Sequence, residues 1–213
     1  LYSPVAIAIN PTLFEKINYR IEDFVGVSYI GDAPLLLVAN NALPVRNIID
    51  LINLAKVRPG EVRFSSSAIG SSSHLASEMM RMMAGVEMQH IPYKGGGPAL
   101  NDVIGGQVPV FFGSVASTKQ YVDSGKLNAL AVTGKKRASS MPNVPTMAEA
   151  GIPGYEVYEW NGIFAPAATP APILLKISNA IAKVMQSVEV KDKVLSLGGE
   201  PFQGGSEVAD KFI

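Results

Sequence analysis

A run of small hydroxylated residues stands between a short apolar stretch and a stretch with helical spacing. Residues 64–75 read FSSSAIGSSSHL, and Ile69 is the only bulky side chain between Ser65 and Gly70. The start of a helix leaves backbone N–H groups without partners and carries partial positive charge. Serine hydroxyls add further donors. We therefore predict an anion site here, for a carboxylate or phosphate, and the alternative is that the serines only cap the helix.

Two further segments place small residues where a predicted strand meets a predicted helix. Residues 93–98 (YKGGGP) follow the apolar stretch 88–92, and residues 112–114 (FGS) end the apolar stretch 108–112. In open α/β sheets, ligands bind beyond the carboxyl ends of the strands, so the three junctions predict half of a ligand cleft. The candidate ligand-binding residues are Ser66, Ser67, Gly70, Ser71, Ser72, Gly96, Gly113 and Ser114. Lys94 can pair with an anion, but we favour a solvated lysine at this turn.

The residue types needed for catalysis or metal binding do not occur in the required spacing. His74 and His90, the only histidines, lack metal-ligand spacing, and we expect structural roles for both. Nucleophile-elbow and P-loop motifs are absent, and Leu100 replaces the third glycine of a dinucleotide motif. We expect Glu78 to pair with Arg81 on a helix surface. The sequence thus predicts no catalytic residue, metal or cofactor, and a hydrolase is the weakest alternative because neither histidine is visibly placed to activate a serine.

Strand and helix patterns alternate from residue 35 to residue 133. The strands are predicted at 33–39, 62–66, 88–92, 108–112 and 127–133, and the helices at 47–58, 72–84, 98–104 and 115–124. In the second helix the apolar residues Leu75, Met79, Met82 and Met83 recur at helical spacing. This alternation predicts an α/β fold with a parallel or mostly parallel sheet. The continuous apolar run at 33–39 predicts a strand buried on both faces of that sheet.

The remaining segments are less regular. Residues 1–9 suggest a strand or buried loop before a turn at 10–12, and 24–30 form a second short apolar piece. The proline-rich segment 134–154 reads as a linker or wrapping segment with at most one helical turn, near 146–150. A strand is predicted at 157–164, followed by a helix that begins at Thr169-Pro170 and a last helix at 190–197 that ends at Gly198-Gly199.

Composition excludes several classes of partner. The chain has 213 residues, of which 47% are hydrophobic and 17% charged, with 18 basic and 18 acidic side chains. Its only basic run is 135–137, so nucleic acid is not an expected partner. The absence of cysteine excludes disulfides and thiolate metal sites, and no apolar segment reaches the length of a membrane span.

Several stretches resemble one family. They are FSSSAIGSSSHLASE, HIPYKGGGPALNDVIGGQV, SGKLNALAVTGKKR, MPNVPTMAEAGIPGYEV and WNGIFAPAATPAP. In this order, over nearly the whole chain, they are similar to the substrate-binding proteins of tripartite tricarboxylate transporters, also called the Bug family. The motif Pro-Thr-x-x-Glu-Ala-Gly-x-Pro-Gly at 145–154 is specific to that resemblance.

The resemblance implies a periplasmic solute receptor with the type II periplasmic-binding-protein (Venus-flytrap) fold. Its two lobes, each a mostly parallel sheet flanked by helices, would close on a small organic carboxylate. Lobe one would consist of 1–32 and 157–213, and lobe two of 33–156. The implied carboxylate donors are at Ser66, Gly70, Ser71 and Ser72. The implied partners are integral-membrane transporter subunits, and the implied state is a monomer.

Two departures from the family pattern lead to further expectations. Relatives begin some tens of residues earlier, so lobe one is expected to be incomplete, and ligand binding is expected to need the missing part. Relatives commonly carry Asp where this chain has Pro109 and Gly113, which suggests a carboxylate ligand without an α-amino group. The alternative function is the effector-sensing domain of a transcription regulator, which would require an upstream helix-turn-helix segment.

Overall fold

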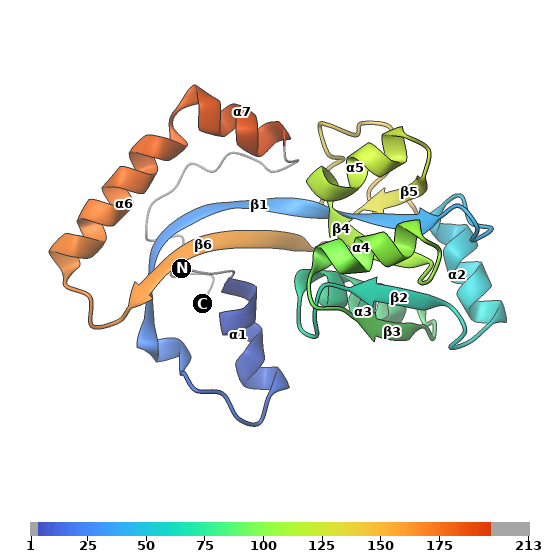
Figure 1. The fold of residues 1–213 in the computed structure, drawn as a ribbon, viewed down its shortest axis with the longest axis horizontal. Coiled ribbons are helices and arrows are strands. Elements are labelled where there is room, and N and C mark those ends of the chain that lie inside the picture. The colour runs from blue at the N-terminus through green and yellow to red at the C-terminus, as the bar shows by residue number, and fades with distance from the viewer. Residues whose placement is uncertain (1–3, 197–213) are drawn as a thin grey trace. The chain divides into compact units, whose positions relative to one another are not determined.

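The computed structural model describes residues 4–196. Two compact units divide the described residues: one is 34–158, and the other comprises the described parts of 1–33 and 159–213. Two strands belong to both units, β1 (Phe24–Asn40) and β6 (Tyr158–Pro166). These strands pair with each other, and their arrows point in opposite directions in Figure 1. The sequence predicted two separate pieces at 24–30 and 33–39, but they form the single strand β1.

The unit 34–158 is built on a mixed sheet. Its strand order is β3-β2-β4-β1-β5, with β2 at Arg63–Ser66, β3 at Gln89–Pro92, β4 at Val110–Ser114 and β5 at Leu127–Val132. Strand β2 runs parallel to β3 and β4, whereas β1 runs antiparallel to β4 and β5. The sheet is therefore not mostly parallel as predicted. Every residue from 34 to 40 is buried, but an apolar run reports burial on two faces and not strand direction, so the expected parallel neighbours of 33–39 were wrong.

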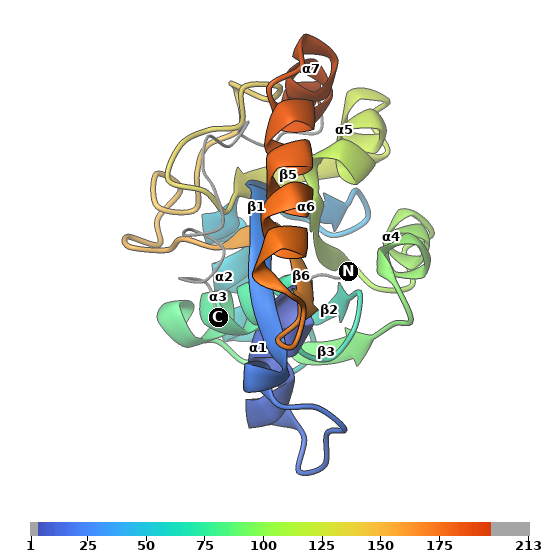
Figure 2. The ribbon, with the colours of Figure 1, turned by 90° about the vertical axis from the view of Figure 1, so that its left-hand side faces the viewer.

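Helices cover both faces of this sheet. Alternate residues of β1 point to opposite faces, with Leu35 and Leu37 in one apolar cluster and Leu36 and Val38 in the other. The first cluster includes residues of α2 (Ile48–Val57) and α3 (Ser72–Ala84), and the second includes residues of α4 (Gly96–Ile104) and α5 (Val115–Asp123). Figure 2 shows α2 and α3 on one side and α4 and α5 on the other.

The helix boundaries near the candidate site follow the sequence signals. The Asn47 side chain accepts a hydrogen bond from the Asp50 N–H at the start of α2, and α3 ends at Gly85, whose φ of +62° is left-handed. The predicted helices at 47–58 and 72–84 are thus confirmed.

The apolar face predicted for α3 is not the face that packs on the sheet. The buried residues are Ser72, Ser73, Ala76, Ser77 and Met80, whereas Met82 is 81% exposed. Small side chains such as those of Ala76 and Ser77, both fully buried, allow the helix axis to approach the strands closely. Periodicity alone favoured the methionines because they are the larger apolar side chains.

The second unit contains α1 (Pro4–Leu13), the short 3₁₀ helix Ile21–Asp23, α6 (Ala171–Met185) and α7 (Val188–Ser196). The prediction of a strand or loop at 1–9 and a turn at 10–12 is wrong for the described residues, which are helical. The pair Asn10-Pro11 suggested a turn, but Pro11 lies near the end of α1 and removes only one backbone donor there. The predicted strand at 157–164 and helix after Thr169-Pro170 are confirmed as β6 and α6. The predicted helix end at Gly198-Gly199 lies outside the described residues.

The segment 134–154 contains no helix or strand and is held by specific contacts. The Thr146 N–H donates to the Glu149 carboxylate at 2.9 Å, the Glu149 N–H donates to Thr146 Oγ1 at 3.1 Å, and Arg137 Nε donates to the same carboxylate at 2.8 Å. The Tyr155 hydroxyl then donates to the Ala76 carbonyl of α3 at 2.7 Å. The motif at 145–154 therefore contains a capped turn, and the tyrosine that follows the motif bonds to α3, which gives this region a structural role.

Candidate functional site

Three junctions between a strand and a helix lie along one edge of the sheet. Because β2 is parallel to both β3 and β4, the carboxyl ends of these three strands point the same way. The Ser66 carbonyl accepts the Tyr93 N–H at 3.0 Å, and the Ser67 carbonyl accepts the Gly95 N–H at 2.7 Å. The structure thus brings the β2–α3 loop and the β3–α4 loop into direct contact, with the end of β4 on the other side of β2.

Side-chain hydroxyls hold the β2–α3 loop in shape. Ser71 is the N-cap of α3: its Oγ accepts the His74 N–H at 3.3 Å and donates to the Ala68 carbonyl at 2.7 Å. The Ser67 N–H donates to Ser73 Oγ at 2.9 Å, and Ser73 Oγ also lies 3.0 Å from Ser71 Oγ. Part of the hydroxyl cluster therefore serves the loop itself rather than a ligand.

A stack of three rings stands behind this loop. The rings of His74 and His90 have centroids 4.0 Å apart at 18°, and His90 stacks on Phe64 at 5.0 Å and 15°. Ser66 Oγ lies 2.6 Å from His90 Nε2 and 3.1 Å from the Ala68 carbonyl. The sequence pattern did not place either histidine to activate a serine, and the structure shows that His90 contacts the buried Ser66. The parallel pairing of Phe64 with His90, which sets this proximity, is not visible in the sequence.

Burial favours the neutral form of both imidazoles. It is the main cause that lowers the pKa of His90 from 6.5 to about 4, and the charge of His74 lowers it further. Burial also lowers the pKa of His74, where Glu78 acts in the opposite direction and Arg81 in the same direction. Glu78 pairs with Arg81 at 2.6 Å, as the sequence predicted.

Backbone donors remain available at the start of α3 and α4. Among the residues that the structure describes, no acceptor faces the N–H groups of Ser72 and Ser73. Helix α4 begins after Gly95, which provides no side-chain cap, and a Cβ added at Gly96 or Gly97 would meet no atom within 4 Å. Two helix starts therefore carry N–H groups without an acceptor among the described residues at one edge of the sheet, and the start of α4 has open space around it, an arrangement suited to an anion.

Gly113 and Ser114 differ from the other candidates. Gly113 is buried, and a Cβ there would lie 2.6 Å from both Phe111 Cε1 and Thr118 Cγ2, so no side chain fits without displacing its neighbours. Ser114 caps α5, where its Oγ accepts the Ser117 N–H at 3.3 Å and donates to Ser117 Oγ at 2.8 Å. Both residues shape the third junction through packing and capping.

Catalytic and metal chemistry find little support in the described part of the chain. Ser66 is fully buried, so a substrate carbonyl has no access to the oxygen that faces His90. Residues 4–196 contain no group of three metal-ligating side chains, and within the same range no helix has the length and apolar character needed to cross a bilayer. Lys94 is exposed.

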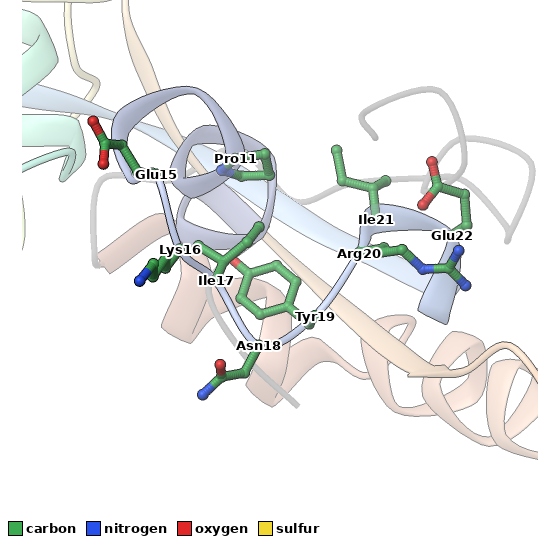
Figure 3. Close-up of a pocket in the computed structure, with 9 residues that line it drawn as sticks. All are labelled: Pro11, Glu15, Lys16, Ile17, Asn18, Tyr19, Arg20, Ile21 and Glu22. Atoms are coloured by element: carbon green, nitrogen blue, oxygen red, sulfur yellow. The ribbon is translucent and has the colours of Figure 1, made fainter.

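A hollow of about 610 Å³ lies in the other unit, along residues 11 and 15–22. Figure 3 shows that the lining residues all come from one segment of the chain and that the polar ends of Glu15, Asn18 and Glu22 point in different directions. Ligand sites combine an enclosed surface with polar groups that converge. The hollow does not meet this second condition.

Known proteins match nearly the whole chain. Residues 2–213 match the family model TctC, the tripartite tricarboxylate transporter family receptor. Protein BugT of Bordetella pertussis is 36% identical over 200 residues, which are 93% of this chain and 61% of BugT. The chain thus spans less than two thirds of that relative.

Two solved structures are similar as well. The structure of Rhodopseudomonas palustris Rpa4515 with adipate is 35% identical with a TM-score of 0.88, and the match covers 93% of this chain and 67% of that one. The structure of MatC from Rhodopseudomonas palustris with bound malate is 28% identical with a TM-score of 0.82, covering 92% and 66%. Together with the mixed sheet flanked by helices, these neighbours show the type II periplasmic-binding-protein fold.

Proposed function

Since the chain belongs to the tripartite tricarboxylate transporter receptor family, we propose that it captures a small organic carboxylate and delivers it to integral-membrane transporter subunits. The receptor works in the periplasm, as a monomer and without catalysis. Adipate in one solved relative and malate in another support a carboxylate as the ligand. No comparison supports the alternative of a regulator's effector domain.

The observation that carries this proposal is the pair of helix starts with unsatisfied N–H groups. The N–H groups of Ser72 and Ser73, together with those of Gly96 and Gly97, would donate charge-assisted hydrogen bonds to a ligand carboxylate. Ser67, Gly70 and Ser71 form the wall of the same site. The buried residues Ser66 and Gly113, with the capping residue Ser114, support it from behind.

Closure of two lobes completes the proposed mechanism. Lobe one is 1–32 with 157–213, and lobe two, which carries the anion site, is 33–156. Closing the lobes over the ligand would exclude water and strengthen each hydrogen bond to the carboxylate. The two compact units, which meet in sequence at 33/34 and 158/159, support this division.

A charge placed at the α4 start tests the site. Gly97 has open space around its missing Cβ, so Gly97→Asp is expected to fold and to repel a carboxylate, with Gly97→Asn as the neutral control of the same shape. A thermal-shift screen of the full-length protein with mono-, di- and tricarboxylates and aromatic acids first identifies the ligand, and calorimetry then compares the variants in the same full-length protein. Equal affinity of the Asp and Asn variants would contradict the site.

We further propose that the ligand lacks an α-amino group. An ammonium group needs an acidic acceptor, and the space where Gly113 would carry one is filled by Phe111 and Thr118. Succinate and adipate are therefore expected to bind better than aspartate and glutamate in calorimetry. Tight, saturable binding of either amino acid would refute this specificity.

A further inference from the structure

One hydrogen bond in the β2–α3 loop depends on the charge of a histidine. The Gly70 N–H donates to His74 Nδ1 at 3.1 Å. A ring nitrogen accepts a hydrogen bond only when it carries no proton, so His74 must be neutral with its proton on Nε2. Gly70 is buried and left-handed, with φ of +76°, so its N–H has few other acceptors within reach.

The ring stack fixes the direction of that acceptor. The ring of His74 stacks on His90, and the ring of His90 stacks on Phe64. Ser66 Oγ contacts Nε2 of His90. Because the ring of His74 cannot rotate freely within this stack, Nδ1 stays directed at Gly70. The same residue supplies the N–H that Ser71 Oγ accepts, so the last two residues of the turn 68–71 are both bonded to His74.

We propose that neutral His74 is a positioning residue that holds the turn 68–71 in its ligand-binding shape, and that protonation of His74 releases this turn and weakens carboxylate binding. Protonated Nδ1 becomes a donor and faces the Gly70 N–H, so the bond is lost and two donors are left opposed. The proposal rests on the proposed function, because this turn leads directly into the N–H groups of Ser72 and Ser73.

The charged groups around His74 determine where the first proton goes. On α3, Glu78 Oε1 lies 3.8 Å from His74 Nε2 and favours the charged ring, whereas Arg81 opposes it; from β3, His90 opposes a second charge. Because Glu78 stands next to His74, the first proton of the stacked pair goes to His74. The second meets a charged neighbour, which contributes to the low pKa of about 4 at His90.

A bound carboxylate has two opposite effects on this equilibrium. It attracts a proton to His74 through solvent, where salt screens the attraction. It also binds only when the turn 68–71 keeps its shape, and protonation of His74 breaks the Gly70–His74 hydrogen bond that holds this turn. We expect the loss of the Gly70–His74 hydrogen bond to outweigh the screened attraction. Carboxylate affinity should then fall as the pH drops below 6.5, the ordinary pKa of histidine, toward the lowered pKa of His74.

Nitrogen-15 NMR of the ligand-free protein tests the hydrogen bond itself. At pH 7.5 we expect the shift of a bare Nδ1 and a protonated Nε2 for His74, and slow exchange of the Gly70 amide proton. Between pH 7.5 and 4.5 the Gly70 amide shift is expected to follow the titration of the His74 ring. A protonated Nδ1 at pH 7.5, or a Gly70 amide that does not respond to the ring, would overturn the proposal.

Two substitutions separate the acceptor from the ring. His74→Asn keeps an oxygen at the position of Nδ1 without a titrating group, and His74→Phe keeps the stacked ring without an acceptor. With adipate and malate as probes, we expect His74→Asn to bind within about threefold of wild type at pH 7.5 and to lose the pH dependence between 7.5 and 5. His74→Phe is expected to bind at least about tenfold more weakly at every pH, a difference of about 1.4 kcal/mol.

The opposite order of carboxylate affinities for these two variants would show that the His74 ring acts only by stacking. If His74→Phe binds like wild type and His74→Asn does not, His74 acts only through stacking and the proposal is wrong. If the full-length protein, tested with its N-terminal part, binds neither acid while the His74 ring and the Gly70 amide behave as expected, the failure belongs to the proposed ligand class. The proposal that the Gly70–His74 hydrogen bond positions the turn would then remain supported.

Discussion

The β2–α3 loop and the β3–α4 loop lie side by side but keep their shapes by different means. In the first, Ser71, Ser73 and His74 bond the backbone through side chains. In the second, Gly95 turns the chain with φ of +122° and ψ of 160°, and no side chain caps α4. The first loop is therefore sensitive to side-chain chemistry and pH, and the second to backbone conformation alone.

The backbone of Ser67 bonds to both loops. The Gly95 N–H donates to the Ser67 carbonyl at 2.7 Å, while the Ser67 N–H donates to Ser73 Oγ. The backbone of Ser67 thus connects a loop held by side chains to a loop held by glycine. A change in either loop is expected to reach the other through this residue.

Ser73→Ala is expected to have the largest effect. Ser73 is 4% exposed, and its Oγ accepts the Ser67 N–H and contacts two further hydroxyls, so the substitution leaves the partly buried Ser67 N–H without its partner and removes two hydroxyl contacts. We expect the free energy of unfolding to fall by about 2–3 kcal/mol, measured by urea denaturation, and carboxylate affinity to fall as well.

The control for this variant is Ser139→Ala, since Ser139 is exposed and makes no hydrogen bond within the described part of the chain. It is expected to change stability by less than about 0.5 kcal/mol. Equal stability of the two variants would show that hydroxyls do not hold the first loop, and the contrast between the loops would disappear.

Gly95→Ala tests the second loop. Its backbone conformation belongs to a region that only glycine adopts readily, although the new Cβ would meet only Pro98 Cδ at 3.8 Å. Strain without a clash predicts a loss of about 1–2 kcal/mol of stability. Gly97→Ala, in a helical position with open space, is the matched control and is expected to stabilise slightly.

Equal Tm values for the Gly95→Ala and Gly97→Ala variants would mean that the second loop tolerates other backbone conformations. Amide exchange at Ser67 adds a second measurement. Because Gly95 bonds the Ser67 carbonyl, Gly95→Ala is expected to speed exchange in the first loop, whereas Gly97→Ala is not.

The sequence predicted the positions of these loops but not how they are held. The cap at Asn47, the stop at Gly85 and the alternation of strands and helices are local signals, and the structure confirms them. The three junctions fall on one edge because β2, β3 and β4 are parallel, which the alternating pattern also predicts. Those parts depend on residues close together in the chain.

The unpredicted features depend on pairings between distant residues. His74 and His90 meet only because β2 and β3 pair with Phe64 opposite His90, and no motif encodes that register. The direction of β1 was missed because its apolar run indicates burial alone. For Gly113 the sequence suggested a missing acceptor, whereas the structure shows packing against Phe111 and Thr118 that leaves no room for one.

Acid is expected to destabilise the first loop and spare the second. The pKa values of His74 and His90 are lowered in the folded protein, so the unfolded chain binds more protons once the pH falls below 6.5. Their contribution to stability is thus complete above that pH and is lost toward about 4. We expect the Tm to fall on the order of a few degrees, with faster amide exchange at Gly70 than at Gly95.

The acid effect is expected to shrink when the ring stack behind the first loop is altered, and to persist when the second loop is altered. His90→Phe, which keeps a stacked ring beside Phe64, is expected to remove part of the pH dependence of the Tm between 6.5 and 4.5. Gly97→Ala is expected to keep it in full. If both variants retain the wild-type pH profile, the carboxylates elsewhere in the chain cause the acid effect.

The smallest expected effect comes from a contact that supports the body of α3 rather than its N-terminal turn. The buried Tyr155 hydroxyl donates to the Ala76 carbonyl at 2.7 Å, and burial raises the pKa of that hydroxyl. Because Ala76 lies one turn beyond Ser72, Tyr155→Phe removes support from the body of the helix and leaves its N-terminal donors in place. We expect a loss of about 0.5–1 kcal/mol of stability and unchanged carboxylate affinity, with Tyr121→Phe as the control. An affinity loss as large as that of Ser73→Ala would mean that the loop takes its shape from the helix behind it, and not from its own hydroxyls.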